Sequence, residues 1–216
     1  MRLPLELPIT PMLAKSVPTV PVADDARWSY EPKWDGFRCI VLRDGAEIEL
    51  ASRGSKPLTR YFPELVEALR RLVPERCAVD GEIVVRTGEP GRERLNWEAL
   101  SQRIHPAESR VRLLSVQTPA EFVAFDLLAV GDDNLTGMPF SHRRTQLEQA
   151  LAHLSHGDPV HLTRVTTNAA QAQEWFERFE GAGLDGVIAK GRDTAYTPGK
   201  RTMLKVKHKR TADAVV

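Results

Sequence analysis

The chain has 216 residues, a length that suits one large domain or two small ones with a substantial buried core. Hydrophobic residues make up 42% of the composition and charged residues 27%, which excludes a disordered, collagen-like or membrane-embedded chain. Since 30 lysines and arginines against 29 acidic residues leave a net charge of +1, any binding of nucleic acid must depend on a local patch of cations.

Prolines are spread through residues 1–30 and predict an extended arm on the surface of the domain. Prolines and Glu6 interrupt the N-terminal apolar residues before a signal peptide can form, and no stretch approaches the roughly 18 apolar residues of a membrane span. Cys39 and Cys77 lie in apolar, strand-like runs, which favours buried thiols in a reducing compartment. We therefore expect a cytoplasmic protein that does not contact the membrane.

Strand-like runs begin after the arm. An Asp-Gly pair separates the first two runs, which is a strong indication of a hairpin. The expected strands cover residues 37–42, 46–51, 77–85, 121–130, 186–190 and 202–207. They come in hairpin-like groups rather than in strict βαβ alternation, so the pattern favours an α+β domain with largely antiparallel sheets flanked by helices.

Helices are predicted from apolar residues at helical spacing. One stripe starts at Leu65 behind Pro63, a good first helical residue, and a weaker helix covers residues 96–103. A second stripe runs from Leu147 to Leu154 with Ser141 as the expected cap. The last contains Ala172, Trp175, Phe176 and Phe179, and is expected to open near Asn168 and to close at Gly181.

The segment from Glu31 to Arg38 carries the most chemical information. It contains the arrangement Lys-x-Asp-Gly-x-Arg, in which Lys33 stands just before a strand and Arg38 follows five residues later. An amine attacks only when it is deprotonated, so a nucleophilic Lys33 must be activated by nearby cations, a metal or desolvation. The alternative is a surface turn in which Lys33 and Asp35 are solvated, and a lone Lys-Asp-Gly does not decide between the two.

With its other motifs, the sequence resembles the covalent nucleotidyltransferases, and among them the ATP-dependent DNA ligases, especially the bacterial C and D types used in end joining. Besides the Lys33 segment, Pro11–Ala14 is similar to the N-terminal segment of that family. The further matching segments, in the family's order, are Ser52–Gly54, Val79–Val84, Phe122–Leu128, Leu184–Lys190 and Met203–Lys207.

The resemblance implies an ATP-grasp-like nucleotidyltransferase domain over residues 31–210, with residues 1–30 packed on it as the arm. Family ligases continue into an OB-fold domain, whereas this sequence stops at Ala212–Val216. We therefore expect residues 211–216 to be a linker, the OB-fold domain to be absent, and an OB fold in cis or a repair partner in trans to complete the enzyme. The implied protein is a bacterial, nucleoid-associated monomer that acts on nicked double-stranded DNA.

The resemblance also implies a role for each matching residue. Lys33 attacks the α-phosphate of ATP to form a lysyl-AMP, which is then passed to the 5′-phosphate of the nick. Glu31 contacts the adenine amino group and Phe125 stacks on the ring. Arg38 and Arg53 face phosphates and the DNA end, and Lys190, Lys205 and Lys207 face the α-phosphate. Glu82 holds the ribose or a metal, and Asp185 holds the metal, Mg²⁺ or Mn²⁺.

Some alternatives stay open from the residues alone. Phe125 lies in an apolar strand with Phe122 and Leu127, so the strand pattern does not separate a binding side chain from a core one. Asp185 stands where the family has glutamate, which shortens the reach by one methylene. An RNA ligase, a capping guanylyltransferase and a non-catalytic nucleotide- or DNA-binding module remain competing interpretations.

Overall fold

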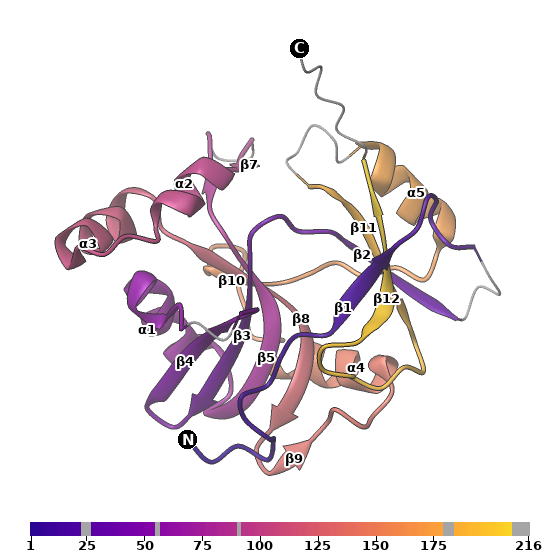
Figure 1. Ribbon diagram of the computed structural model, residues 1–216, viewed down its shortest axis with the longest axis horizontal. Helices are drawn as coiled ribbons and strands as arrows, with labels where there is room; N and C mark the ends of the chain where they lie inside the picture. The colour runs from indigo at the N-terminus through magenta and orange to yellow at the C-terminus, as the bar shows by residue number, and fades with distance from the viewer. Residues whose placement is uncertain (23–26, 55–56, 90–91, 179–183, 209–216) are drawn as a thin grey trace.

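The computed structural model describes residues 1–22, 27–54, 57–89, 92–178 and 184–208. Two β-sheets stand side by side, and the N-terminal arm crosses from one to the other (Figure 1). Most strand pairs are antiparallel, whereas β1 with β12 and β8 with β10 are parallel. The expected α+β fold with largely antiparallel sheets is confirmed. Phe179, Gly181 and the segment 209–216 lie outside the described residues.

The smaller sheet has four strands and includes the strand that ends just before Lys33. In their order across the sheet they are β1 (Leu13–Ser16), β12 (Arg201–Lys207), β11 (Gly186–Gly191) and β2 (Trp28–Pro32). The arm contributes β1 and β2, which the sequence analysis did not predict. Helix α5 (Ala169–Arg178) packs against β2 and β11. The Asn168 side chain accepts hydrogen bonds from the amides of Ala170 and Gln171 in the first turn of α5, and the helix opens near Asn168 as expected.

The larger sheet contains the central hairpins. In order, its main strands are β10 (Val160–Leu162), β8 (Glu121–Val130), β5 (Arg76–Val84), β3 (Phe37–Asp44) and β4 (Glu47–Ser52), with the short β9 (Asp133–Asn134) beside β8. The Asp44-Gly45 hairpin between β3 and β4 is confirmed, with Gly45 at a φ of 60°. Beyond the sheet, β6 (Arg86–Thr87) and β7 (Arg94–Leu95) form a small ribbon.

Helices surround the larger sheet. They are η1 (Thr59–Tyr61), α1 (Pro63–Leu72), α2 (Trp97–Gln102), α3 (Glu108–Gln117) and α4 (Phe140–Ala150). The predicted helices at residues 63–72 and 96–103 are confirmed, the second with the Asn96 side chain as its cap. The expected cap Ser141 is wrong: the cap position of α4 is Pro139, two residues earlier, and no side chain caps the helix. That helix also ends at Ala150, before Leu151 and Leu154.

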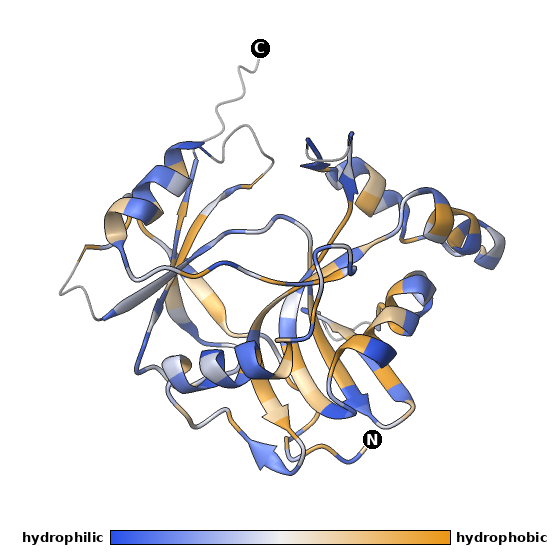
Figure 2. Cartoon of the chain, turned by 180° about the vertical axis from the view of Figure 1, so that it is seen from behind, coloured by the Kyte–Doolittle hydropathy of each residue, from blue (hydrophilic) through white to orange (hydrophobic). Residues whose placement is uncertain are grey.

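Apolar residues concentrate on the strands, while the helices expose polar faces (Figure 2). One core cluster lies under α1 and another under α5. A third joins the two sheets, with Met12 from the arm against Ile40 and Met203. Cys39 and Cys77 are buried free thiols, as expected, and burial raises the pKa of Cys77 to about 12. In the described part of the chain, no helix is long and apolar enough to cross a bilayer.

Candidate active site

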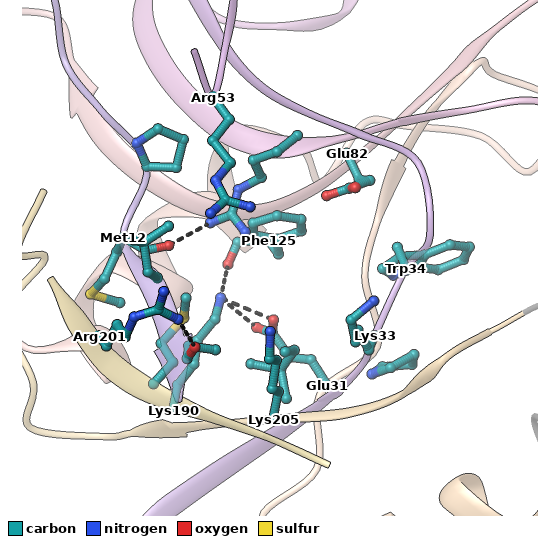
Figure 3. Close-up of a pocket in the computed structure, with 17 residues that line it drawn as sticks. Met12, Glu31, Lys33, Trp34, Arg53, Glu82, Phe125, Lys190, Arg201 and Lys205 are labelled. Carbon is teal, nitrogen blue, oxygen red and sulfur yellow. Dashed lines mark hydrogen bonds and ion pairs between the residues drawn. The ribbon is translucent and has the colours of Figure 1, made fainter. Parts of the chain in front are cut away.

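A pocket of about 200 Å³ opens between the two sheets (Figure 3). Its walls come from the arm at Pro11–Ala14, from β2 and the loop after it, and from strands of both sheets. The expected site residues that line it are Glu31, Lys33, Arg38, Arg53, Glu82, Phe125, Lys190 and Lys205. Residues that are distant in the sequence thus meet at one cavity.

Lys33 occupies the loop between β2 and β3, and backbone hydrogen bonds hold this loop to the start of β11. The Lys33 amide donates to the Gly186 carbonyl at 2.8 Å, and the Asp185 amide donates to the Lys33 carbonyl at 3.2 Å. The Lys33 ammonium lies 2.9 Å from Asp185 Oδ2 and is 16% exposed. The backbone therefore fixes the amine beside a carboxylate at the edge of the pocket.

Asp185 and Lys207 do not line the pocket but belong to the same charge cluster. The Lys207 ammonium lies 3.1 Å from Asp185 Oδ2, the oxygen that Lys33 also contacts. Burial acts to raise the pKa of Asp185, but hydrogen bonds from the two lysines outweigh it and hold the pKa below its ordinary value. Asp185 is therefore ionised and shared between two ammonium groups.

The deep end of the pocket holds a buried ion pair beside an aromatic ring. The Lys190 ammonium lies 2.9 Å from Glu31 Oε2 and donates to the Phe125 carbonyl at 3.0 Å. It also lies 4.8 Å from the centre of the Phe125 ring. Burial raises the pKa of Glu31, and the charge of Lys190 opposes this rise. This end offers a donor, an acceptor and an apolar face within one small volume.

Phe125 is directed into the pocket by a β-bulge. Asp80 pairs with Asp126 and Gly81 pairs with Ala124, so Phe125 is the extra residue of β8 between the two pairs. A bulge interrupts the alternation of side chains and changes the direction of the bulged one. The sequence could not show this, because a bulge leaves no mark on the apolar pattern of the strand.

Arg38 is held by a carboxylate that the sequence analysis did not single out. Its guanidinium donates to both oxygens of Asp80, at 2.6 and 2.7 Å, and lies 4.4 Å from the centre of the Phe125 ring. Asp80 is fully buried and also accepts a hydrogen bond from the Tyr196 hydroxyl at 2.6 Å. An acid inside the apolar run 77–85 could have indicated a buried partner, but no local pattern marks Tyr196.

Glu82 faces the pocket from β5, directly opposite Arg38 in the register. Its Oε1 accepts a hydrogen bond from the Gly36 amide at 3.2 Å. A Cβ on Gly36 would lie only 2.2 Å from the Ile83 carbonyl oxygen, so this close approach requires glycine. Burial raises the pKa of Glu82 to about 7, although the charges of Arg38 and Lys33 oppose the rise.

Cations gather at the mouth of the pocket. Arg53, Arg201 and Lys205 line it together with Lys33. Burial lowers the pKa of Lys205, and the charges of Lys207, Lys33, Arg201 and Arg53 lower it further. Such crowding of positive charge is unfavourable without an anion, so this end of the pocket is suited to phosphate.

Arg201 and Trp34 also line the pocket, and the sequence analysis had assigned neither of them a role there.

A divalent metal site is not preformed in the described residues, because no group of three or more carboxylate, histidine or cysteine side chains comes together there. Glu82 and Asp185 nevertheless supply hard oxygen ligands near the cation-rich mouth. Mg²⁺ commonly binds through one or two carboxylates, keeps several waters and takes its other ligands from substrate phosphates. These residues therefore fit a metal that binds together with a nucleotide.

Comparison with known proteins identifies the family. The sequence model described as ATP dependent DNA ligase domain matches residues 11–207. The chain belongs to this family. DNA ligase C2 of Mycolicibacterium smegmatis is 58% identical to this ligase-family chain over 216 residues, which cover all of the chain and 58% of the relative. DNA ligase C of Mycobacterium tuberculosis is 57% identical over 222 residues, which cover all of the chain and 59% of the relative.

Solved ligase structures share the fold. A structure described as mycobacterial DNA ligase D complexed with ATP and MES has a TM-score of 0.67 and 30% identity, and the match covers 94% of this chain and 62% of that one. The ligase domain of LigD from M. tuberculosis has a TM-score of 0.68 and 29% identity, covering 94% and 61%. The resemblance to ligases of the C and D types is confirmed. The chain spans about three fifths of the length of these relatives.

Proposed function

We propose that this chain is the adenylation domain of an ATP-dependent DNA ligase and that Lys33 is its nucleophile. The observation that carries the proposal is the position of the Lys33 amine. It lies beside Asp185 at the cation-rich end of a pocket whose other end holds an aromatic ring and a donor–acceptor pair. A nucleoside triphosphate has the complementary order of groups, with a flat base at one end and phosphates at the other.

The deep end suits adenine. The amino group of adenine is a donor and the neighbouring ring nitrogen is an acceptor, so Glu31 accepts from the first and Lys190 donates to the second. Guanine carries the reverse pattern on that edge and would leave both buried groups without a match, which is costly. Phe125 supplies the face on which the base stacks. In this assignment Lys190 serves the base, whereas the resemblance had placed it at the α-phosphate.

At the mouth of the pocket, Lys33 attacks the α-phosphorus. The Lys33 ammonium first loses a proton to water. The bond from Nζ to phosphorus then forms as the bond to the bridging oxygen of pyrophosphate breaks, and a second proton leaves the nitrogen for water or the departing pyrophosphate. Neighbouring cations stabilise the developing charge on the phosphate oxygens. We assign this stabilisation to Lys205, Lys207, Arg38 and Arg53. Bound Mg²⁺ or Mn²⁺ would neutralise phosphate charge, held by Glu82 and Asp185.

The second half of the proposed reaction moves AMP from Lys33 to the 5′-phosphate of nicked double-stranded DNA. An OB-fold domain in cis, or a repair partner in trans, would hold the duplex over the pocket. We also propose that residues 31–210 form the adenylation domain with residues 1–30 packed on it, and that the protein works as a monomer in the bacterial cytoplasm near the nucleoid. Within these two segments, residues 23–26, 55–56, 90–91, 179–183 and 209–210 lie outside the described part of the chain.

The deciding experiment is covalent labelling. Incubation with α-labelled ATP and magnesium is expected to attach one AMP per chain, detected by intact-mass analysis and located at Lys33 by peptide mapping. Lys33→Ala should abolish the label, while the matched control Lys15→Ala, an exposed lysine on β1, should keep it. Undiminished label on Lys33→Ala would refute the assignment.

A further inference from the structure

A buried polar network lies behind the pocket, and the chemistry proposed above does not account for all of it. Its centre is the carboxylate of Asp80, which receives two hydrogen bonds from Arg38 and a third from the Tyr196 hydroxyl. Asp80 is fully buried and Tyr196 is 4% exposed. Burying a polar group lowers the stability of the folded state unless the group finds a hydrogen-bond partner. Two donors from Arg38 already bind Asp80, so the additional buried hydroxyl of Tyr196 requires an explanation.

Tyr196 uses both hydrogen-bonding functions of its hydroxyl. The hydroxyl donates to Asp80 Oδ2 at 2.6 Å and accepts from the Met12 amide at 3.0 Å. Met12 belongs to the arm and lines the pocket, and its carbonyl lies 3.5 Å from Arg38 Nη2. One phenol therefore joins the arm to the carboxylate that holds Arg38.

Tyr196 is itself fixed in place. It lies in the loop between β11 and β12, and its amide donates to the Thr136 carbonyl at 2.8 Å. The Arg143 guanidinium lies 5.7 Å from the centre of its ring. A side chain held in this way can serve as a rigid reference point for the groups bound to it.

The carboxylate of Asp80 needs such a reference point. Rotation about the last bond of an aspartate side chain has broad minima, so the strand alone does not set the plane of its carboxylate. The plane in turn sets the direction of a guanidinium bound through two parallel hydrogen bonds. Among the described residues, no hydrogen-bond partner is recorded for Nη1 of Arg38, which leaves that group available to an anion in the pocket.

We propose that Tyr196 is a positioning residue of the adenylation reaction: through Asp80 it sets the direction of the Arg38 guanidinium over Phe125, and through Met12 it fixes the arm at the rim of the pocket. The proposal rests on the proposed function, in which Arg38 stabilises phosphate. Tyr196 itself touches neither the nucleotide nor Lys33 and acts only through Arg38 and the arm.

The test is a double-mutant cycle on the single-turnover rate of lysyl-AMP formation. Tyr196→Phe should lower the rate constant about tenfold, while the ATP concentration that gives half the maximal rate changes less than about twofold. In the Arg38→Ala background, Tyr196→Phe should cost only about two- to threefold, because the route through Arg38 is already gone and only the contact to the Met12 amide of the arm remains to be lost. A merely structural role would give the same tenfold loss in both backgrounds, and that result would overturn the proposal.

Tyr30→Phe is the matched control. Tyr30 is as buried as Tyr196, and its hydroxyl also makes a 2.6 Å hydrogen bond, but to the Pro21 carbonyl. This variant should adenylate at the wild-type rate. If Tyr30→Phe loses as much activity as Tyr196→Phe, then removal of any buried tyrosine hydroxyl has this effect, and the proposal fails.

A second measurement separates this proposal from the proposed function. Hydrogen exchange of the Arg38 Nε proton, followed by NMR without nucleotide, should accelerate several-fold in Tyr196→Phe and stay unchanged in Tyr30→Phe. Unchanged exchange in both variants would overturn the positioning role, whether or not the chain uses ATP. Absence of lysyl-AMP in the wild-type protein would refute the proposed function instead, while accelerated exchange would still support the link from Tyr196 to Arg38.

Discussion

Replacing Glu82 by glutamine should make the stability of the protein less dependent on pH. The folded protein raises the pKa of this carboxyl from 4.5 to about 7, mainly by burial. Between these two values the folded state binds a proton that the unfolded chain has released, so wild-type stability falls as the pH rises through this window. Above about pH 7 the loss is complete and constant. Glutamine carries no charge at any pH, so the variant does not lose stability in this pH window.

The magnitude follows from the size of the shift. A pKa unit corresponds to about 1.4 kcal/mol, so a fully dry carboxyl would lose about 3 kcal/mol across the window. Because the Glu82 side chain opens onto the pocket, where water screens its charge, we expect about half of that, or 1 to 2 kcal/mol. Relative to wild type, Glu82→Gln should therefore gain about 1 to 2 kcal/mol between about pH 5 and about pH 8.

Urea unfolding at these two pH values, without nucleotide or divalent metal, measures the difference. Glu49→Gln is the matched control, because Glu49 is an exposed glutamate on β4 of the same sheet. The control should differ from wild type by the same amount at both pH values. If Glu82→Gln behaves like the control, burial does not raise the pKa of Glu82 and the reasoning is wrong.

Three further predictions concern the packing around the site and its charge. Asp126→Asn should destabilise the protein by about 3 to 5 kcal/mol in urea unfolding, because it leaves the fully buried Arg143 without its carboxylate partner. A loss of stability below about 1 kcal/mol would contradict this prediction. Gly186→Ala should lower the free energy of unfolding by about 2 to 4 kcal/mol and reduce AMP labelling. Gly186 has a φ of 143°, and a Cβ at this position would lie 1.9 Å from the Val206 carbonyl oxygen. A variant that melts and is labelled like the wild type would refute this prediction. Lys200 is an exposed cation at the start of the acid-free run 200–207, where we expect DNA phosphates to bind. Lys200→Ala should therefore reduce by about 1 the steepness of log affinity against log salt for nicked duplex DNA, measured by fluorescence anisotropy. An unchanged slope would show that Lys200 does not contact a DNA phosphate.

The fold was largely predictable where burial and periodicity agree. All six expected strands and the helix behind Pro63 are confirmed, because each has a continuous apolar run or stripe. Helix α3 was missed because Leu113 and Val116 are exposed and obscure its helical period. Strand β2 was missed because Glu31 and Pro32 are unusual in a strand; its pairing with β11 and the burial of Glu31 with Lys190 compensate for both.

The site shows a similar limit. The resemblance to the ligase motifs indicated many of the residues that line the pocket, since each motif is a short local segment, but it did not indicate Trp34 or Arg201. The partners that hold them come from elsewhere in the chain: Asp185 beside Lys33, Tyr196 beside Asp80, and the bulge that directs Phe125. Such long-range contacts depend on strand register and loop packing, which no local pattern encodes. The sequence also left open whether Asp185, which stands where the family has glutamate, reaches its partner. Its shorter side chain does form an ion pair with Lys33.

The pairing of β1 with β12 has a consequence for how the protein acquires its structure during synthesis. The larger sheet uses residues 37–162, so most of it can form while translation continues. Strand β2, which ends just before Lys33, and strand β1 of the arm gain their strand partners only when residues 186–207 have left the ribosome. Contacts between such distant segments close long loops and form slowly. We expect Lys33 to remain unreactive on the nascent chain, so that the pocket is the last part of the domain to be completed.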